Sequence, residues 1–143
     1  GTAGHKWRSE IASDMQRYYG GLVDVFGFGN HPISNKSKAF DNYVYSVVIE
    51  NEESDFYITE KIVDCLIGWC IPIYAGSQNI HRLLGCQIPT IPFGCSSDVA
   101  ISLINRIIGT GGVSNSSLAK LRANSLQRLN MFSALPELIQ SHR

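Results

Sequence analysis

The sequence predicts an α/β domain in which helices cover both faces of a parallel sheet. Two runs rich in β-branched and aromatic residues, YVYSVVIE (43–50) and IPIYAG (71–76), are typical of strands. An amphipathic stretch that starts near Thr59 separates them, and near-continuous apolar strands alternating with helices favour parallel pairing. The 143 residues are 44% hydrophobic and 17% charged, which fits a single domain over residues 1–143 with one core.

The segment before the first of these strands predicts a helix and a further strand. Its apolar residues recur at helical spacing: Trp7, Ile11, Met15 and Tyr18. Gly20 and Gly21 end this pattern, and the apolar run LVDVF (22–26) is of strand type. Residues 27–38 are rich in turn formers and are expected to form a loop.

The central helix is expected to begin at Thr59. One face of it carries apolar side chains, which we expect in the core: Ile62, Cys65, Leu66 and Trp69. After the strand 71–76, residues 77–85 predict a short helix. QIPTIPF (87–93) predicts a strand at the sheet edge, where proline is tolerated.

Two helices are expected at the C-terminal end. The first is marked by Val99, Leu103, Ile104 and Ile107 and ends at GTGG (109–112). The second is capped by Ser114 or Asn115 and runs through Leu129, and the tail 133–143 adds a turn or two.

Charge and cysteine content exclude several classes of function. Twelve basic and twelve acidic residues give zero net charge, so we expect no nucleic acid partner, and any anion site must be local. The four cysteines lack metal-ligand spacing and are interpreted as buried thiols of a reducing compartment; we expect no bound metal. We expect a cytoplasmic location, with the inner face of a membrane as an alternative, because no apolar run approaches the ~20 residues of a membrane span.

A lysine stands in the first turn of the predicted central helix. The partial positive charge of a helix N-terminus favours acidic residues there, so Glu60 fits and Lys61 does not. A phosphate bound to the free N–H groups would explain the lysine. The alternative is that Glu60 complements the helix dipole while Lys61 extends into solvent.

A second helix start also carries positive charge. In GHKWR, the residues His5, Lys6 and Arg8 open the first predicted helix. Ligands of open parallel sheets bind outside the carboxyl ends of the strands, where such helix starts gather. Together the two cationic helix starts predict a phosphate-bearing ligand.

The block from residue 43 to 76 resembles the donor-binding motif of the α-1,3-fucosyltransferase family, glycosyltransferase family 10. IEN (49–51), YITEK (57–61) and IPIYAG follow one another in the order and at the spacing of that motif. GHKWRSEI and VDVFG resemble a segment of bacterial members, so the resemblance covers Gly4 to Pro92.

The resemblance implies a GT-B-type enzyme that transfers fucose from GDP-fucose to a glycan hydroxyl with inversion and without a catalytic metal. This chain resembles its C-terminal, Rossmann-like half, the nucleotide-sugar (donor) binding domain. Six residues correspond to donor-binding positions: Arg8, Glu50, Asn51, Tyr57, Glu60 and Lys61.

Each of these positions carries a role by resemblance. Arg8 and Lys61 would neutralise the diphosphate, and Glu60 would hold the ribose hydroxyls. Asn51 and Tyr57 would line the donor pocket near the nucleotide and the fucose. Such cations stabilise the charge that develops on the departing GDP.

Two departures from the family pattern keep alternatives open. Glu50 would support the loop at the strand end, but the serine that usually follows Asn51 is replaced by Glu52, so a transferase of the same fold using another nucleotide sugar remains an alternative. The general base belongs to the family's N-terminal acceptor domain, which has no counterpart here. We therefore expect no catalytic residue in this chain, and an acceptor domain that joins it in cis or in trans. A non-catalytic module that lost its ligand is the third hypothesis.

Other polar residues have simpler interpretations. Asp55 is expected in a turn rather than in a carboxylate pair with Glu60. His31 and His81 are interpreted as surface or loop residues. The GFGN loop (27–30) lacks a full glycine-rich phosphate motif, and we expect it to approach the nucleotide base together with Lys36.

Overall fold

A two-stranded parallel sheet forms the centre of the computed structural model, which describes residues 3–26, 39–111 and 113–129. Strand β1 (Tyr45–Ile49) pairs with β2 (Ile71–Ala75), in register from Tyr45 opposite Ile71 to Ile49 opposite Ala75. Both central strands and their parallel pairing were predicted correctly. Parallel strands need a long crossover, and the segment containing α2 supplies it.

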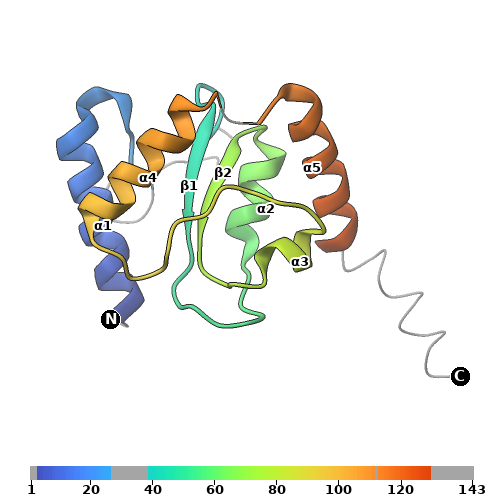
Figure 1. Ribbon diagram of the computed structural model, residues 1–143, viewed down its shortest axis with the longest axis horizontal. Coiled ribbons are helices and arrows are strands. Elements are labelled where there is room, and N and C mark those ends of the chain that lie inside the picture. The colour runs from blue at the N-terminus through green and yellow to red at the C-terminus, as the bar shows by residue number, and fades with distance from the viewer. Residues whose placement is uncertain (1–2, 27–38, 112, 130–143) are drawn as a thin grey trace, which may run out of the picture.

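Helices cover both faces of the sheet (Figure 1). On one face lie α1 (Ala3–Tyr19) and α4 (Ser97–Gly109). On the other lie α2 (Glu60–Ile67), α3 (Ile80–Leu84) and α5 (Asn115–Leu129). A single 3₁₀ turn, η1 (Gly20–Leu22), follows α1. The architecture is thus α/β, as predicted, and is consistent with a Rossmann-like unit with a small sheet.

The core is divided between the two faces by β2, whose five residues are all buried. Ile73 packs in one cluster with Ile11 of α1 and Ile104 of α4. Tyr74 packs in the other cluster with Leu66 of α2 and residues of α3 and α5. Burial on both sides explains why this strand is a continuous apolar run.

Two of the expected strands are not formed in the described residues. In 22–26 only Phe26 takes part in a bridge; Asp24 accepts a hydrogen bond from the Tyr43 hydroxyl, and Phe26 packs against the Tyr43 ring. In 87–93 a single bridge joins Thr90 to Tyr74 of β2. The Ile91 N–H donates to the Tyr74 carbonyl oxygen, and the next bond toward the N-terminal side would need an N–H at Pro89, which proline lacks.

Trp69 does not lie in the core, contrary to the sequence-based expectation. The helix α2 ends before Gly68, and Trp69 follows in a left-handed conformation with φ of 58°. Its side chain is 53% exposed and the Arg122 guanidinium lies 4.5 Å from the ring centre. The Arg122 Nε–H also donates to the Leu66 carbonyl oxygen at 3.0 Å, which satisfies one carbonyl at the end of α2.

The cysteines are free thiols, and two of the four are buried as predicted, Cys65 and Cys70; Cys86 and Cys95 are half-buried. Burial raises the pKa of the Cys65 thiol to about 12. None of the described helices is long and apolar enough to span a membrane. The predictions for the 27–38 loop with His31 and Lys36, and for the tail 133–143, fall outside the described residues.

Candidate functional site

The start of α1 lies directly against the chain that leaves β1. A Cβ atom at Gly4 would stand 1.8 Å from the Asn51 carbonyl oxygen, a distance that no real side chain tolerates. Glycine is therefore required for this close approach. The contact brings the first turns of α1 to the carboxyl end of the sheet, where the topology of parallel sheets places ligands.

Arg8 reaches the carboxyl end of β1 from this helix. Its Nη1–H donates to Oδ1 of Asn51 at 2.5 Å, across 43 residues of sequence. Its Nη2 lies 2.9 Å from Nδ1 of His5. Asn51 is uncharged, so it orients the half-buried guanidinium without cancelling its charge.

Glu50 is the residue around which the other half of the site is built. Its side chain is fully buried. Oε1 accepts from the backbone N–H of Thr59 at 2.9 Å, and Oε2 accepts from the Thr59 hydroxyl at 2.7 Å. Burial of a carboxylate is costly unless it is paired and hydrogen-bonded, and both conditions are met here.

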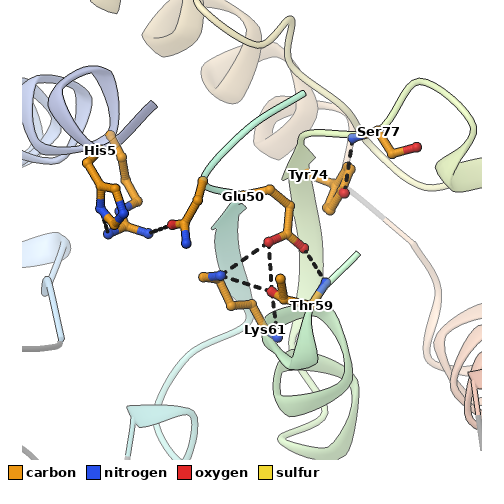
Figure 2. A network of polar contacts seen from close by, with 8 residues as sticks. His5, Glu50, Thr59, Lys61, Tyr74 and Ser77 are labelled. Carbon is orange, nitrogen blue, oxygen red and sulfur yellow. Dashed lines mark hydrogen bonds and ion pairs between the residues drawn. The ribbon is translucent and has the colours of Figure 1, made fainter. Parts of the chain in front are cut away.

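Lys61 supplies the pairing charge. Its ammonium lies 3.2 Å from Oε2 of Glu50 and 2.9 Å from the Thr59 hydroxyl (Figure 2). The Lys61 side chain is 30% exposed, so it does not extend freely into solvent. A lysine in the first turn of α2 thus has an intramolecular counter-charge: the carboxylate at the end of β1 offsets its unfavourable interaction with the helix dipole.

Thr59 links this ion pair to the start of α2. It is the N-cap, and its hydroxyl also accepts weakly from the Lys61 backbone N–H at 3.5 Å. A helix start at Thr59 was predicted; that the Thr59 hydroxyl joins Glu50 to Lys61 was not. Ile62, Cys65 and Leu66 then anchor the helix, since each is fully buried.

The remaining predicted donor residues lie near this cluster. Glu60 is exposed in the first turn of α2, and Tyr57 is half-buried in the segment before it. Asp55 lies in a turn, as predicted, where its carbonyl oxygen accepts from the Ser77 hydroxyl at 2.7 Å. The structure therefore brings Arg8 to Asn51 and Lys61 to Glu50, while the ligand roles given to all six residues stay predictions.

The turn after β2 contributes residues that sequence reasoning did not single out as part of a site. A Cβ at Gly76 would lie 2.5 Å from the Tyr74 hydroxyl and 2.7 Å from Cγ of Glu50. Tyr74 is a core residue, and its hydroxyl accepts from the Ser77 N–H at 3.2 Å. A glycine directly after a buried strand was the signal that would have identified this close contact.

The charge of the buried Glu50 carboxylate acts on the Tyr74 hydroxyl. Burial, first, and the charge of Glu50, second, raise the pKa of Tyr74 to about 12, against the opposing effect of the Ser77 N–H. The phenol is therefore neutral at physiological pH and serves as a fixed hydrogen-bonding group rather than as an acid or base.

A groove of about 470 Å³ opens beside this turn. It runs between the loop that follows β2 and the segment that pairs with β2 at Thr90, and its lining includes Glu53, Gln78, Pro92 and Phe93. Gly76 lies both in this lining and against Glu50, so the groove adjoins the ion-pair cluster.

Metal ligation has no support within 3–26, 39–111 and 113–129: these residues contain no cluster of three or more His, Cys, Asp or Glu side chains suited to an ion. His81 lies half-buried in α3 and its Nδ1 accepts from the Ile88 N–H at 3.3 Å. This contact gives His81 a local structural role in place of a ligand's.

Comparison with known proteins gives one line of relationship. The chain is 30% identical over 63 residues to the alpha-(1,3)-fucosyltransferase FucT of Helicobacter pylori. The matched segment is 44% of this chain and 13% of that protein, so the chain spans a small part of its relative's length. No protein-family model and no solved structure matches the chain. The similarity supports a fucosyltransferase-like relationship.

Proposed function

We propose that this chain is the donor-binding region of a fucosyltransferase-like glycosyltransferase. It binds GDP-fucose for inverting transfer of the fucose to a glycan hydroxyl. The general base and the acceptor domain come from an N-terminal region, joined in cis or in trans. In this proposal the region is the Rossmann-like half of a GT-B-type enzyme.

The observation that carries the proposal is the meeting of two distant segments at one end of the sheet. Arg8 arrives from α1 and Lys61 from α2, and each contacts one of two consecutive residues, Asn51 and Glu50. The partial similarity to a fucosyltransferase supports the same proposal.

The chemistry suits departure of a nucleoside diphosphate. As the glycosidic bond breaks, negative charge grows on the diphosphate, and preoriented cations stabilise that charge more in the transition state than in the ground state. Arg8 offers a guanidinium with a fork of N–H donors. Lys61 has three N–H donors, of which Glu50 and Thr59 engage two, which leaves one for the ligand.

The other four positions complete the proposed donor site. Glu60, at the exposed start of α2, holds the ribose hydroxyls, while Asn51 and Tyr57 line the pocket for the nucleotide and the fucose. Glu50 supports the loop from its buried position. No metal is required in this scheme, because the two cations and the N-terminus of α2 supply the positive charge.

Calorimetric titration of the 143-residue chain with GDP, GDP-fucose, UDP-glucose and ADP tests the proposal. Saturable binding with preference for GDP and GDP-fucose is expected. Preference for UDP-glucose or ADP would assign the fold to another nucleotide sugar. No heat from any of the four, with an intact circular dichroism spectrum, would refute donor binding by this chain.

A non-catalytic module is the second candidate function, and one observation favours it. The Glu50 carboxylate already neutralises Lys61, and Glu52 and Glu53 add exposed negative charge to the same loop. The net positive charge available to a diphosphate at this loop is therefore smaller than the sequence motif predicts. The titration above separates this candidate from the first.

A further inference from the structure

We propose that Ser77 is a positioning residue for donor binding, a role that rests on the function proposed above. Its hydroxyl holds the turn that immediately precedes Tyr57, one of the residues assigned to the donor pocket. Ser77 acts through this turn and does not itself need to touch the nucleotide sugar. It is not among the six positions to which the resemblance gives a donor role.

The end of β2 gives Ser77 a rigid base. Hydrogen bonding between the strands continues past β1, because the Glu50 N–H donates to the Ala75 carbonyl oxygen at 2.9 Å. Ser77 follows two residues later and is 2% exposed. Its N–H donates to the hydroxyl of the buried Tyr74 at 3.2 Å (Figure 2). The sheet and its core therefore fix the backbone that carries the Ser77 hydroxyl.

The Ser77 hydroxyl reaches from this base to the segment between β1 and α2. It donates to the Asp55 carbonyl oxygen at 2.7 Å, across 22 positions of sequence. Asp55 lies in a turn in which the Tyr57 N–H donates to the Ser54 carbonyl oxygen at 3.4 Å. The bond from Ser77 thus holds the turn at a point two residues before Tyr57.

The next two side chains make contacts to the same segment. Asn79 is the N-cap of α3, a position where the side chain usually accepts from the helix's own N–H groups. Among the residues that the structure describes, it makes no such bond, and its Nδ2–H donates to the Asp55 carbonyl oxygen at 3.3 Å. Nε2 of Gln78 donates to Oε1 of Glu53 at 3.1 Å. Three consecutive side chains therefore hold one segment, and capping of α3 explains none of these contacts.

A purely local role would use only one side of the Ser77 hydroxyl. Its oxygen accepts from the Asn79 N–H at 3.2 Å, which shapes the turn before α3, as serine hydroxyls often do. Its proton goes to Asp55, on a different part of the chain. The donating side of the hydroxyl is the one that positions the segment before α2.

Loss of this bond should weaken donor binding through the free state of the protein. The far end of the segment stays fixed, because Thr59 is bound to Glu50 through its N–H and its hydroxyl. The turn before Tyr57 would lose its most buried contact and sample more conformations. A donor that binds one of them must then restore the order that Ser77 now supplies, and this cost lowers affinity.

Calorimetric titration of Ser77→Ala with GDP-fucose tests this role. The dissociation constant should rise about tenfold, the upper range for loss of one hydrogen bond. Ser96→Ala is the matched control, because the Ser96 hydroxyl also accepts from a backbone N–H at a helix start, that of Val99 in α4. Its affinity for GDP-fucose should stay unchanged, even if its stability falls.

A double-mutant cycle with Tyr57→Ala separates positioning from general destabilisation. In the Tyr57→Ala background, Ser77→Ala should change the dissociation constant by less than about twofold, because the side chain that it positions is gone. The same tenfold loss in both backgrounds would overturn the positioning role, as would equal effects of Ser77→Ala and Ser96→Ala.

Amide hydrogen exchange provides a second test that needs no ligand. Exchange of the Tyr57 N–H should accelerate about tenfold in Ser77→Ala and stay unchanged in Ser96→Ala. Unchanged exchange in both variants would show that Ser77 does not hold the turn, which overturns the inference.

Titration of the unsubstituted chain separates the two possible failures. If that chain binds GDP-fucose and Ser77→Ala binds it equally well, only the role of Ser77 is overturned. If the unsubstituted chain does not bind GDP-fucose, the proposed function fails and donor positioning fails with it. The exchange rate of the Tyr57 N–H then still decides whether the contact to Asp55 orders the turn.

Discussion

Arg8 and Lys61 have the same sequence signature, a cation at the start of a helix, and very different surroundings. Lys61 is paired with a fully buried carboxylate, whereas Arg8 is held by the neutral amide of Asn51 and by His5. A charge that is neutralised inside the protein stabilises the fold, and a charge that is only oriented remains available to a ligand. The difference predicts that Lys61 is mainly a structural cation and Arg8 mainly a binding one.

The largest effect should come from breaking the Lys61 pair. Lys61→Met leaves the Glu50 carboxylate buried with only the Thr59 donors, which should lower the free energy of unfolding by about 2 to 3 kcal/mol. Urea denaturation followed by circular dichroism measures this loss. Lys6→Met is the matched control, because the Lys6 ammonium stands 3.8 Å from Glu10 in an exposed pair and should contribute less than about 0.5 kcal/mol.

The double variant Lys61→Met/Glu50→Gln separates pairing from packing. Removing both charges should recover part of the stability lost in Lys61→Met, since no buried charge is then left unpaired. A stability no higher than that of Lys61→Met alone would show that the lysine acts through its aliphatic stem and that its charge is not structural.

The second prediction concerns the packing of α1 that positions Arg8 at the site. Gly4→Ala places a Cβ 1.8 Å from the Asn51 carbonyl oxygen, so the start of α1 must move away from the chain after β1. We expect a loss of about 1 to 2 kcal/mol in urea denaturation. Gly21→Ala has open space around it and should cost less. If the two variants are equally stable, α1 does not pack as closely on Asn51 as described.

Sequence patterns were sufficient for the elements whose signals are local. The run 43–50, the Thr59 cap and the apolar face of α2 each predicted a segment from its own residues. The strand predicted at 22–26 is not formed as a continuous strand: a 3₁₀ turn reaches Leu22, and only Phe26 takes part in a bridge. Trp69 was misplaced because the 3.6-residue period was extended past Gly68, where the helix ends and the backbone turns left-handed.

The site was predicted less completely than the fold, for a physical reason. The dipole argument located an unusual lysine, but it could not identify the group that compensates it. That group is Glu50, which stands 11 residues before Lys61 and on another element. Only the crossover geometry of β1 and α2 brings the two side chains together, and neither period nor composition encodes that distance.

A third, smaller effect reports on the charge of Glu50 itself. Because that charge contributes to the raised pKa of Tyr74, Glu50→Gln should lower this pKa, with burial still holding it above 10. A pKa of about 12 in the folded protein against 10.0 in the unfolded chain means that Tyr74 adds stability below pH 10, which is lost as pH rises through 12. Titration of ¹³Cζ-labelled tyrosine measures the pKa of Tyr74 in the original chain and in Glu50→Gln. An unchanged pKa in Glu50→Gln would mean that the carboxylate is screened from Tyr74.

The smallest effect on stability is expected at Arg8, where a loss of nucleotide binding would distinguish it from Lys61. Arg8→Gln keeps a side chain that donates to Asn51 and removes only the charge, so unfolding should change by less than about 0.5 kcal/mol. Nucleotide binding should nevertheless weaken at least about tenfold, because a diphosphate loses its one unneutralised cation in the described site.

Calorimetry with GDP on Arg8→Gln and Lys61→Met then ranks the two positions. If Arg8 is the binding cation, its variant loses affinity at full stability, while Lys61→Met loses stability and a smaller factor of affinity under conditions where it remains folded. The reverse ranking would mean that a ligand displaces Glu50 from Lys61. In that event the buried pair is a resting arrangement that the donor itself opens, and the two helix starts act alike after all.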